Sequence, residues 1–174
     1  MKMMTKLFAA VALATASMSA HAVQADITVW ADVDPTLALL KADGTPLSDV
    51  VEMGYRAGAA GTGSTAGLVP VTEQVRVFSN DVTKAITVRL GSAPSLIPTM
   101  AGPTATAVPL SVSLNSVELT TGGVEFTAAS LFPGSNYPGA SIVVPLTISQ
   151  TTAGPIAVAG RYEGIVSLVM VQKS

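Results

Sequence analysis

The sequence has no cysteine, one histidine and few aromatic or charged side chains. Its 174 residues are 5% aromatic and 11% charged, and the single histidine is His21. Without cysteine the fold contains no disulfide, although an exported protein is free to form them. Histidine and cysteine are also the side chains on which common serine and cysteine hydrolases and zinc sites depend. We therefore expect a protein that is not an enzyme and binds no cofactor or metal, with stability from core burial and strand pairing.

The first 22 residues have the pattern of a secretory signal peptide. Two lysines precede the apolar stretch 7–14, and Ala20 and Ala22 are the small residues that a signal peptidase site requires. The apolar stretch is shorter than the roughly 20 residues of a membrane span. Cleavage before Val23 would remove His21 and leave 152 residues with seven basic and eleven acidic side chains. This mildly acidic balance argues against nucleic acid as a partner.

The mature chain would begin with a short strand. Over residues 26–33 a mostly polar row alternates with an apolar row, which consists of Ile27, Val29, Ala31 and Val33. This period of two is typical of a β-strand, and a terminal strand of this kind can leave its own domain to join another subunit's sheet. Pro35 follows Asp34 and is interpreted as the end of the strand, because proline has a fixed φ and no N–H. The alternative is a hinge between subunits at the Asp34–Pro35 bond.

Short strand candidates recur along the remaining chain, and turn signals such as Ser79-Asn80-Asp81 and Gly122-Gly123 separate them. The candidates are Val50–Tyr55, Val69–Phe78, Ala85–Leu90, Val108–Leu114, Val117–Leu119, Ile142–Ser149 and Tyr162–Val171. The stretches Thr36–Lys41 and Glu125–Leu131 are ambiguous between strand and helix. Many short strands at this spacing predict one all-β domain, a sandwich of immunoglobulin-like type.

The C-terminal run is apolar on both of its predicted faces. One face carries the residues Tyr162, Gly164, Val166, Leu168 and Met170. The opposite face includes Ile165, Val169 and Val171. An exposed strand edge of this composition would promote aggregation. We therefore expect either an ordinary core strand or a strand that another segment covers temporarily.

Other patterns give weaker indications of a site. The N-terminal aspartates lack the EF-hand spacing that would predict calcium binding. The glycine-rich stretch 57–67 lacks the Lys-Ser/Thr pair and following helix of a phosphate-binding loop, and it is interpreted as a surface loop. Trp30 and Tyr162 suggest a sugar-stacking platform, which keeps a secreted carbohydrate-binding β-sandwich module as the alternative function. We favour structural roles, with Tyr162 inside the sandwich and Trp30 at a subunit contact.

Four segments, in their order along the chain, resemble one known family. They are Ile27-Thr28-Val29 with Val33-Asp34-Pro35, the stretch Leu39–Gly44, the turn Val77–Asp81 with Thr83-Lys84, and the ending Ala159–Met170. Together they resemble the major pilins of the colonisation factor antigen I type, also called class 5 or alternate chaperone–usher fimbriae, to which cable pilins are similar. The chain departs from this pattern at Trp30 and in the stretch 57–67.

The resemblance implies an incomplete immunoglobulin-like β-sandwich that lacks one strand and is completed by donor-strand exchange. It implies a signal peptide at residues 1–22, an N-terminal donor strand at 23–35 and a pilin domain at 36–174. A periplasmic chaperone would lend a strand first, and an outer-membrane usher would oversee its replacement by the donor strand of the next subunit. The implied product is a homopolymer on the cell surface, a fimbria whose shaft supports adhesion to host cells through a minor tip adhesin.

Overall fold

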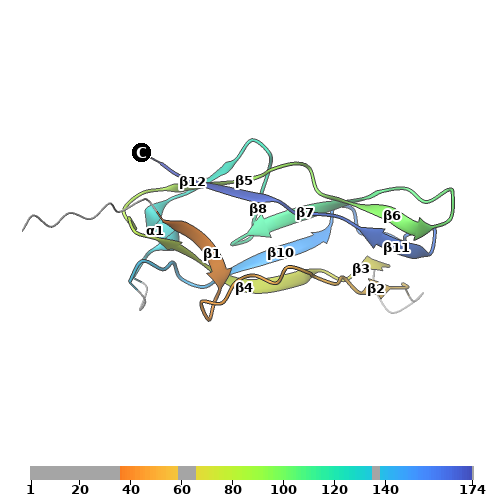
Figure 1. Cartoon of the computed structure of the whole chain (residues 1–174), viewed down its shortest axis with the longest axis horizontal. Helices are drawn as coiled ribbons and strands as arrows, with labels where there is room; N and C mark the ends of the chain where they lie inside the picture. Colours follow the sequence, from red (N-terminus) through yellow and green to blue (C-terminus); the bar gives the residue numbers. More distant parts are fainter. Residues whose placement is uncertain (1–35, 59–65, 135–137, 174) are drawn as a thin grey trace, which may run out of the picture. The chain divides into compact units, whose positions relative to one another are not determined.

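The regular secondary structure of the computed structural model, which describes residues 36–58, 66–134 and 138–173, consists almost entirely of antiparallel strands (Figure 1). The strands are β1 (Leu37–Lys41), β2 (Tyr55–Arg56), β3 (Gly67–Leu68), β4 (Val71–Ser79), β5 (Ile86–Leu90), β6 (Ser95–Ala101), β7 (Val108–Leu114), β8 (Val117–Glu118), β9 (Val124–Phe126), β10 (Val144–Gln150), β11 (Gly160–Glu163) and β12 (Leu168–Gln172). One short helix, α1, spans Ala128–Leu131. The larger sheet has the order β1-β4-β10-β7-β6-β11, with β8 paired to β7. The smaller sheet has the order β12-β5-β9, and β2 pairs with β3.

The core joins the two sheets, and alternating side chains explain how each sheet contributes to it. In β7, Val108, Leu110, Val112 and Leu114 are buried, whereas the residues between them are more exposed. In the smaller sheet, Ile86, Val88 and Leu90 of β5 follow the same rule. The shared cluster consists of Val75, Val77, Ile86, Val88, Leu90, Val112, Leu114, Leu119, Phe126, Leu131, Val144 and Leu146. This arrangement confirms the prediction of an all-β sandwich.

Most of the strongly alternating segments form the strands predicted for them. The predicted strand Val108–Leu114 is observed at those residues, and β4, β5 and β10 begin and end close to their predicted bounds. The ambiguous stretch Thr36–Lys41 contains the strand β1, and the stretch Glu125–Leu131 divides between β9 and α1. The strand β6 is not among the predicted strands.

Two of the predicted strands are wrong. In Val50–Tyr55 only Tyr55 belongs to a strand, and none of the residues from Val50 to Met53 takes part in a sheet of the described chain. The run Tyr162–Val171 is not continuous: β11 pairs with β6 in the larger sheet, and β12 pairs with β5 in the smaller one. The chain passes from one sheet to the other at residues 164–167, where Gly164 lies directly against the Ser95 carbonyl oxygen and leaves no room for a Cβ atom.

Two turns of the larger sheet share one pattern of hydrogen bonds. After β4, the backbone N–H and hydroxyl of Thr83 donate to Asp81 Oδ1 at 3.0 and 2.6 Å. After β1, Thr45 donates in the same way to Asp43 Oδ1 at 2.9 and 2.6 Å. The threonine hydroxyl bonds, followed by the backbone bonds, lower the pKa of both carboxyl groups from the ordinary value of 3.8. The first of these turns is the one predicted at Ser79-Asn80-Asp81.

Candidate functional site: an open apolar groove

A groove of about 1900 Å³ lies between two segments that are far apart in the sequence. One wall is the segment from Leu47 to Tyr55, which connects β1 to β2. The other wall runs from Ile156 through β11 to Leu168. In Figure 1 these orange and blue segments pass on either side of β10. The floor between them includes Leu68, Val71, Glu73, Leu96, Leu110, Leu146 and Ile148.

The strands next to the groove have free edges. Among the named strands, β12 pairs only with β5 and β11 only with β6. The wall from Leu47 to Met53 joins no named strand, although its side chains alternate: Val51 and Met53 are half-buried, whereas Val50 and Glu52 are exposed. This is the side-chain pattern of a strand without a neighbour to complete its ladder. Free edges of this kind can accept an additional strand.

Large apolar side chains at the groove are exposed to solvent. Val50 on one wall is 84% exposed and Ile165 on the other is 83% exposed. Tyr55 and Ile97, which also line the groove, are at least half exposed. Scattered apolar residues are normal on a protein surface, but a contiguous apolar groove marks a site of interaction. The groove therefore has the surface chemistry of an interaction site.

The residues predicted for the C-terminal strand lie in and beside this groove. Tyr162, Gly164, Val166 and Leu168 line it, and Met170 packs against the main core. Tyr162 and the other three apolar side chains are half-buried, while Gly164 is exposed. Although β12 forms the edge of its sheet, Leu168 and Met170 pack against the main core, so the interpretation as an ordinary core strand also stays a prediction. The alternative interpretation, a strand that another segment covers, stays a prediction.

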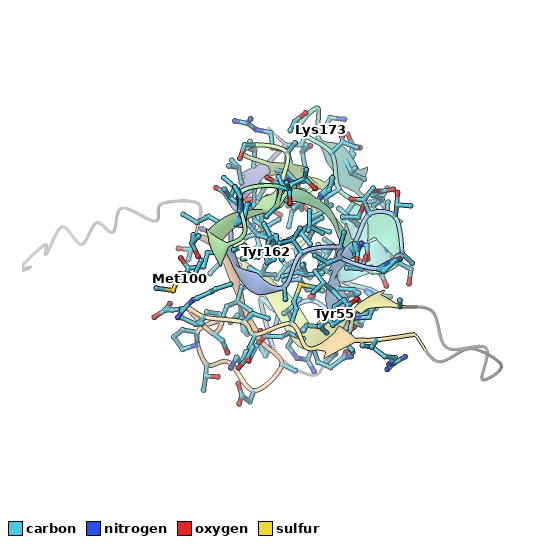
Figure 2. The ribbon with its side chains drawn as sticks, turned by 90° about the vertical axis from the view of Figure 1, so that its right-hand side faces the viewer. Tyr55, Met100, Tyr162 and Lys173 are labelled. Carbon is cyan, nitrogen blue, oxygen red and sulfur yellow. The ribbon has the colours of Figure 1, made fainter. Side chains whose placement is uncertain are left out.

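Both labelled tyrosines near the groove sit on its walls, Tyr55 in β2 and Tyr162 in β11 (Figure 2). The Tyr162 hydroxyl donates to the Val158 carbonyl oxygen at 2.7 Å, so its polar end is satisfied within its own wall. Tyr55 is half exposed. The partner proposed from sequence for a sugar-stacking platform, Trp30, lies outside the described residues. The platform of Trp30 and Tyr162 therefore stays a prediction.

Charged side chains lie mainly along the rim of the groove. Arg161 Nε lies 2.6 Å from Glu163 Oε1, and both side chains are more than half exposed. Asp49 and Glu52 belong to the opposite wall. Glu73 is different because it comes from β4 and lies on the floor. Apart from Glu73, the floor residues named above are apolar.

Several predicted residues cannot be placed. Ala20, Ala22, Val23, the row Ile27, Val29, Ala31 and Val33, and the pair Asp34 and Pro35 lie outside the described residues. Within the described ranges, no three His, Cys, Asp or Glu side chains come together as a candidate metal site. The same ranges contain no helix with the length and hydropathy needed to span a membrane.

Sequence reasoning misses the wall from Leu47 to Tyr55 and the floor residue Glu73. The alternation in that wall is visible in the sequence, but it predicts a paired strand. Glu73 is also visible as a charged residue in the apolar row of a predicted strand, between Val71 and Val75. A charge in such a row is a signal of special function, because buried rows normally exclude unpaired charges.

Comparison with known proteins gives consistent matches over nearly the whole chain. Residues 23–171 match the family model described as CS1 type fimbrial major subunit. A CFA/I fimbrial subunit of Escherichia coli O78:H11 is 37% identical over 170 residues, which cover 95% of each protein. A CS1 fimbrial subunit of Escherichia coli is 31% identical over 176 residues, covering 97% of this chain and 98% of the relative.

A solved structure shares the fold. The CooA pilin subunit from enterotoxigenic Escherichia coli superposes with a TM-score of 0.61 and 24% sequence identity, covering 80% of this chain and 89% of that one. The likeness confirms the prediction of an immunoglobulin-like β-sandwich of the pilin type.

Proposed function

Because the chain belongs to the family of CS1-type fimbrial major subunits, we propose that it builds the shaft of a bacterial surface fimbria by donor-strand exchange. In this proposal, residues 23–35 of one copy insert into the groove of the next copy. The role is structural rather than enzymatic, and the filament is a homopolymer outside the cell. Its contribution to adhesion is to carry a separate tip subunit.

The observation that carries the proposal is the groove between the walls Leu47–Tyr55 and Ile156–Leu168. One wall offers the free edges of β11 and β12, the other is a segment that joins no strand before Tyr55, and the floor and walls expose apolar side chains. An inserted strand can satisfy backbone groups on both sides at once while its inward side chains cover the floor. A small ligand would neither pair with backbone groups on both sides nor cover the whole apolar floor.

The size of the groove also favours a polypeptide. Sites for small molecules usually have volumes of roughly 300–1000 Å³. The groove, at about 1900 Å³, is larger than that range. A strand of eight residues, as in the alternating segment 26–33, extends about 26 Å. An extended segment is therefore the occupant that fits the size and form of this site.

The sequence of residues 23–35 fits the groove in its alternation. The row Ile27, Val29, Ala31 and Val33 would face the apolar floor, and the polar row would face solvent. Pro35 would end the inserted strand, because proline cannot continue a ladder. The described fold then begins almost at once with β1, at Leu37. The donor and acceptor parts of one chain are thus joined by a very short link.

Exposed apolar groove walls also explain why we propose assistance during export. A subunit whose groove is empty exposes Val50 and Ile165 to water and leaves strand edges unpaired, which promotes aggregation. A periplasmic chaperone that lends a strand would protect these edges. An outer-membrane usher would then exchange that strand for the N-terminal segment of the next subunit.

The proposal can be tested by comparing two single substitutions in the mature chain. Val29→Asp places a charge in the apolar row, and Thr28→Asp places the same charge on the neighbouring, polar row. We expect the mature protein to form strand-linked oligomers that survive SDS without boiling. Val29→Asp should abolish them because its carboxylate would be buried, whereas Thr28→Asp should retain them.

Other results would contradict donor-strand exchange. A mature chain that remains a stable monomer would instead support the self-contained carbohydrate-binding module. Equal oligomer yields for the two aspartate variants would show that the alternation of residues 26–33 does not direct assembly. Deletion of residues 27–33 supplies a second check, because it should remove the oligomers, and an added peptide covering residues 23–35 should stabilise the shortened chain.

A further inference from the structure

Glu73 interrupts the apolar inward row of β4. Along this strand Val71, Glu73, Val75 and Val77 alternate with residues on the other face, and Val75 and Val77 are fully buried. Glu73 itself is half-buried on the floor of the groove, opposite Leu146 of β10 in the strand register. The ionisable side chain is therefore placed where an inserted strand would cover it.

Within the described ranges, the Glu73 carboxylate has no ion pair or hydrogen-bonded partner. The nearest cation by register is Lys41, which pairs with Val75 on the same face of the sheet. The Lys41 ammonium donates to Ser48 Oγ at 2.8 Å instead. In the open groove, water can hydrate the Glu73 carboxylate. An apolar side chain pressed onto it would remove that water without supplying a replacement, which is strongly unfavourable for a charge.

The apolar row of the N-terminal segment contains one residue that avoids this cost. Ile27, Val29 and Val33 have branched side chains, whereas Ala31 ends at its Cβ atom. Building on the proposed donor-strand exchange, we propose that Glu73 sets the register of the inserted segment by requiring Ala31 above it. In this register, the space between the short Ala31 side chain and the floor remains large enough for the hydrated carboxylate, and the branched residues cover apolar floor on either side.

The register can be tested in the full mature chain by enlarging the side chain at Ala31 and shortening the one at Glu73. Ala31→Leu should reduce the rate of strand-linked oligomer formation by about tenfold or more, since it overfills the space and buries the carboxylate. Adding Glu73→Ala to Ala31→Leu should restore assembly to near the wild-type rate. The matched control combines Ala31→Leu with Leu68→Ala, which opens space in another part of the floor and should not restore assembly.

A cross-linking measurement gives an independent readout. The chain has no cysteine, so every thiol product comes from introduced residues. We expect Ala31→Cys with Glu73→Cys to be joined between copies by a short bifunctional thiol reagent such as dibromobimane. A direct disulfide is not expected, because facing sheets lie about 10 Å apart and disulfides need Cα atoms within about 7 Å. Val29→Cys or Val33→Cys with Glu73→Cys should cross-link much less.

The outcomes separate this inference from the function on which it rests. If the wild-type chain forms no strand-linked oligomers, donor-strand exchange itself is wrong. If the wild type assembles but Ala31→Leu assembles equally fast, or if Val29→Cys or Val33→Cys gives the dominant cross-link, the register is wrong and the exchange stands. Circular dichroism of each variant checks its fold. If Glu73→Ala does not fold, the cross-link yields decide the register.

Discussion

If the N-terminal segment inserts into the groove as proposed, Ile165 offers a direct measurement of how much free energy the groove contributes to that binding. The side chain lines the groove and is 83% exposed in the subunit. Ile165→Ala should therefore change the stability of the subunit by no more than about 0.5 kcal/mol, as for other exposed positions. Its effect should appear only when an inserted strand covers the side chain.

The expected size of that effect follows from the exposed fraction. Ile→Ala removes three carbon atoms, each worth about 0.8 kcal/mol when buried, or about 2.4 kcal/mol in total. Since the side chain is 83% exposed, most of this burial is still available to a binding partner. Full coverage by the inserted strand then contributes about 2 kcal/mol, which corresponds to roughly a 30-fold change in the dissociation constant.

Trp30 makes the assay simple because it is the single tryptophan of the chain and belongs to the N-terminal segment. A peptide covering residues 23–35 can be titrated with a chain that begins at Thr36, and the tryptophan emission follows binding directly. The Ile165→Ala acceptor should bind the peptide about 30-fold more weakly than the wild type. Val117→Ala provides the control, because Val117 is 43% exposed on β8 and lies outside the groove.

The reasoning would be refuted if Ile165→Ala and Val117→Ala bound the peptide with the same affinity as the wild type. Such a result would mean that the inserted segment does not cover this wall. A large loss of stability of the unbound Ile165→Ala protein would also contradict the structure, because the exposed side chain would then be making contacts within its own fold.

Three further substitutions test other parts of the fold. Leu131→Ala, at the fully buried end of α1, should lower the free energy of unfolding by about 2–5 kcal/mol in a urea titration, whereas an unchanged midpoint would contradict its burial. Gly164→Ala should destabilise the protein by about 1–3 kcal/mol and impair assembly, because the added Cβ meets the Ser95 carbonyl oxygen; calorimetry and oligomer yield would show both effects. Thr83→Val should raise the pKa of Asp81 toward 3.8, as followed by NMR titration of its carboxyl group. Since the pKa of Asp81 is lowered in the folded state, the carboxylate stabilises the fold above pH 3.8. This stabilisation is lost as the pH falls through the pKa of the folded state, and the loss should be smaller in Thr83→Val.

The strands that are well predicted from the sequence are those whose partners lie on both sides. In β7, the buried Val108, Leu110, Val112 and Leu114 alternate strictly, and the strand is paired with β10, β6 and β8. Because both edges of such a strand are paired, its alternation of apolar and polar residues is enough to predict which side chains are buried. The strand β6 escapes prediction because Pro98 interrupts its pattern. In the structure, Pro98 faces Tyr162 where the register shifts, and an irregular ladder tolerates a residue without an N–H.

The groove could be predicted only in part, because it depends on which segments pair in the folded chain. The alternation from Val50 to Tyr55 correctly indicates more buried and more exposed positions, but a strand also needs a partner, which only the tertiary structure reveals. The division of the C-terminal run likewise depends on contact between Gly164 and Ser95, residues distant in sequence. The expectation that another segment covers this run comes from its apolar composition and its family resemblance rather than from its periodicity.

The position of β1 determines how a filament of these proteins would respond to tension. β1 lies at the edge of the larger sheet, and its five residues are each paired in register with β4. If the segment preceding it is held by a neighbouring copy, a pulling force enters each copy through this one ladder. Under load, the β1–β4 ladder would bear the tension first within each copy, and the packing of Leu37 and Leu39 against the core would resist its opening.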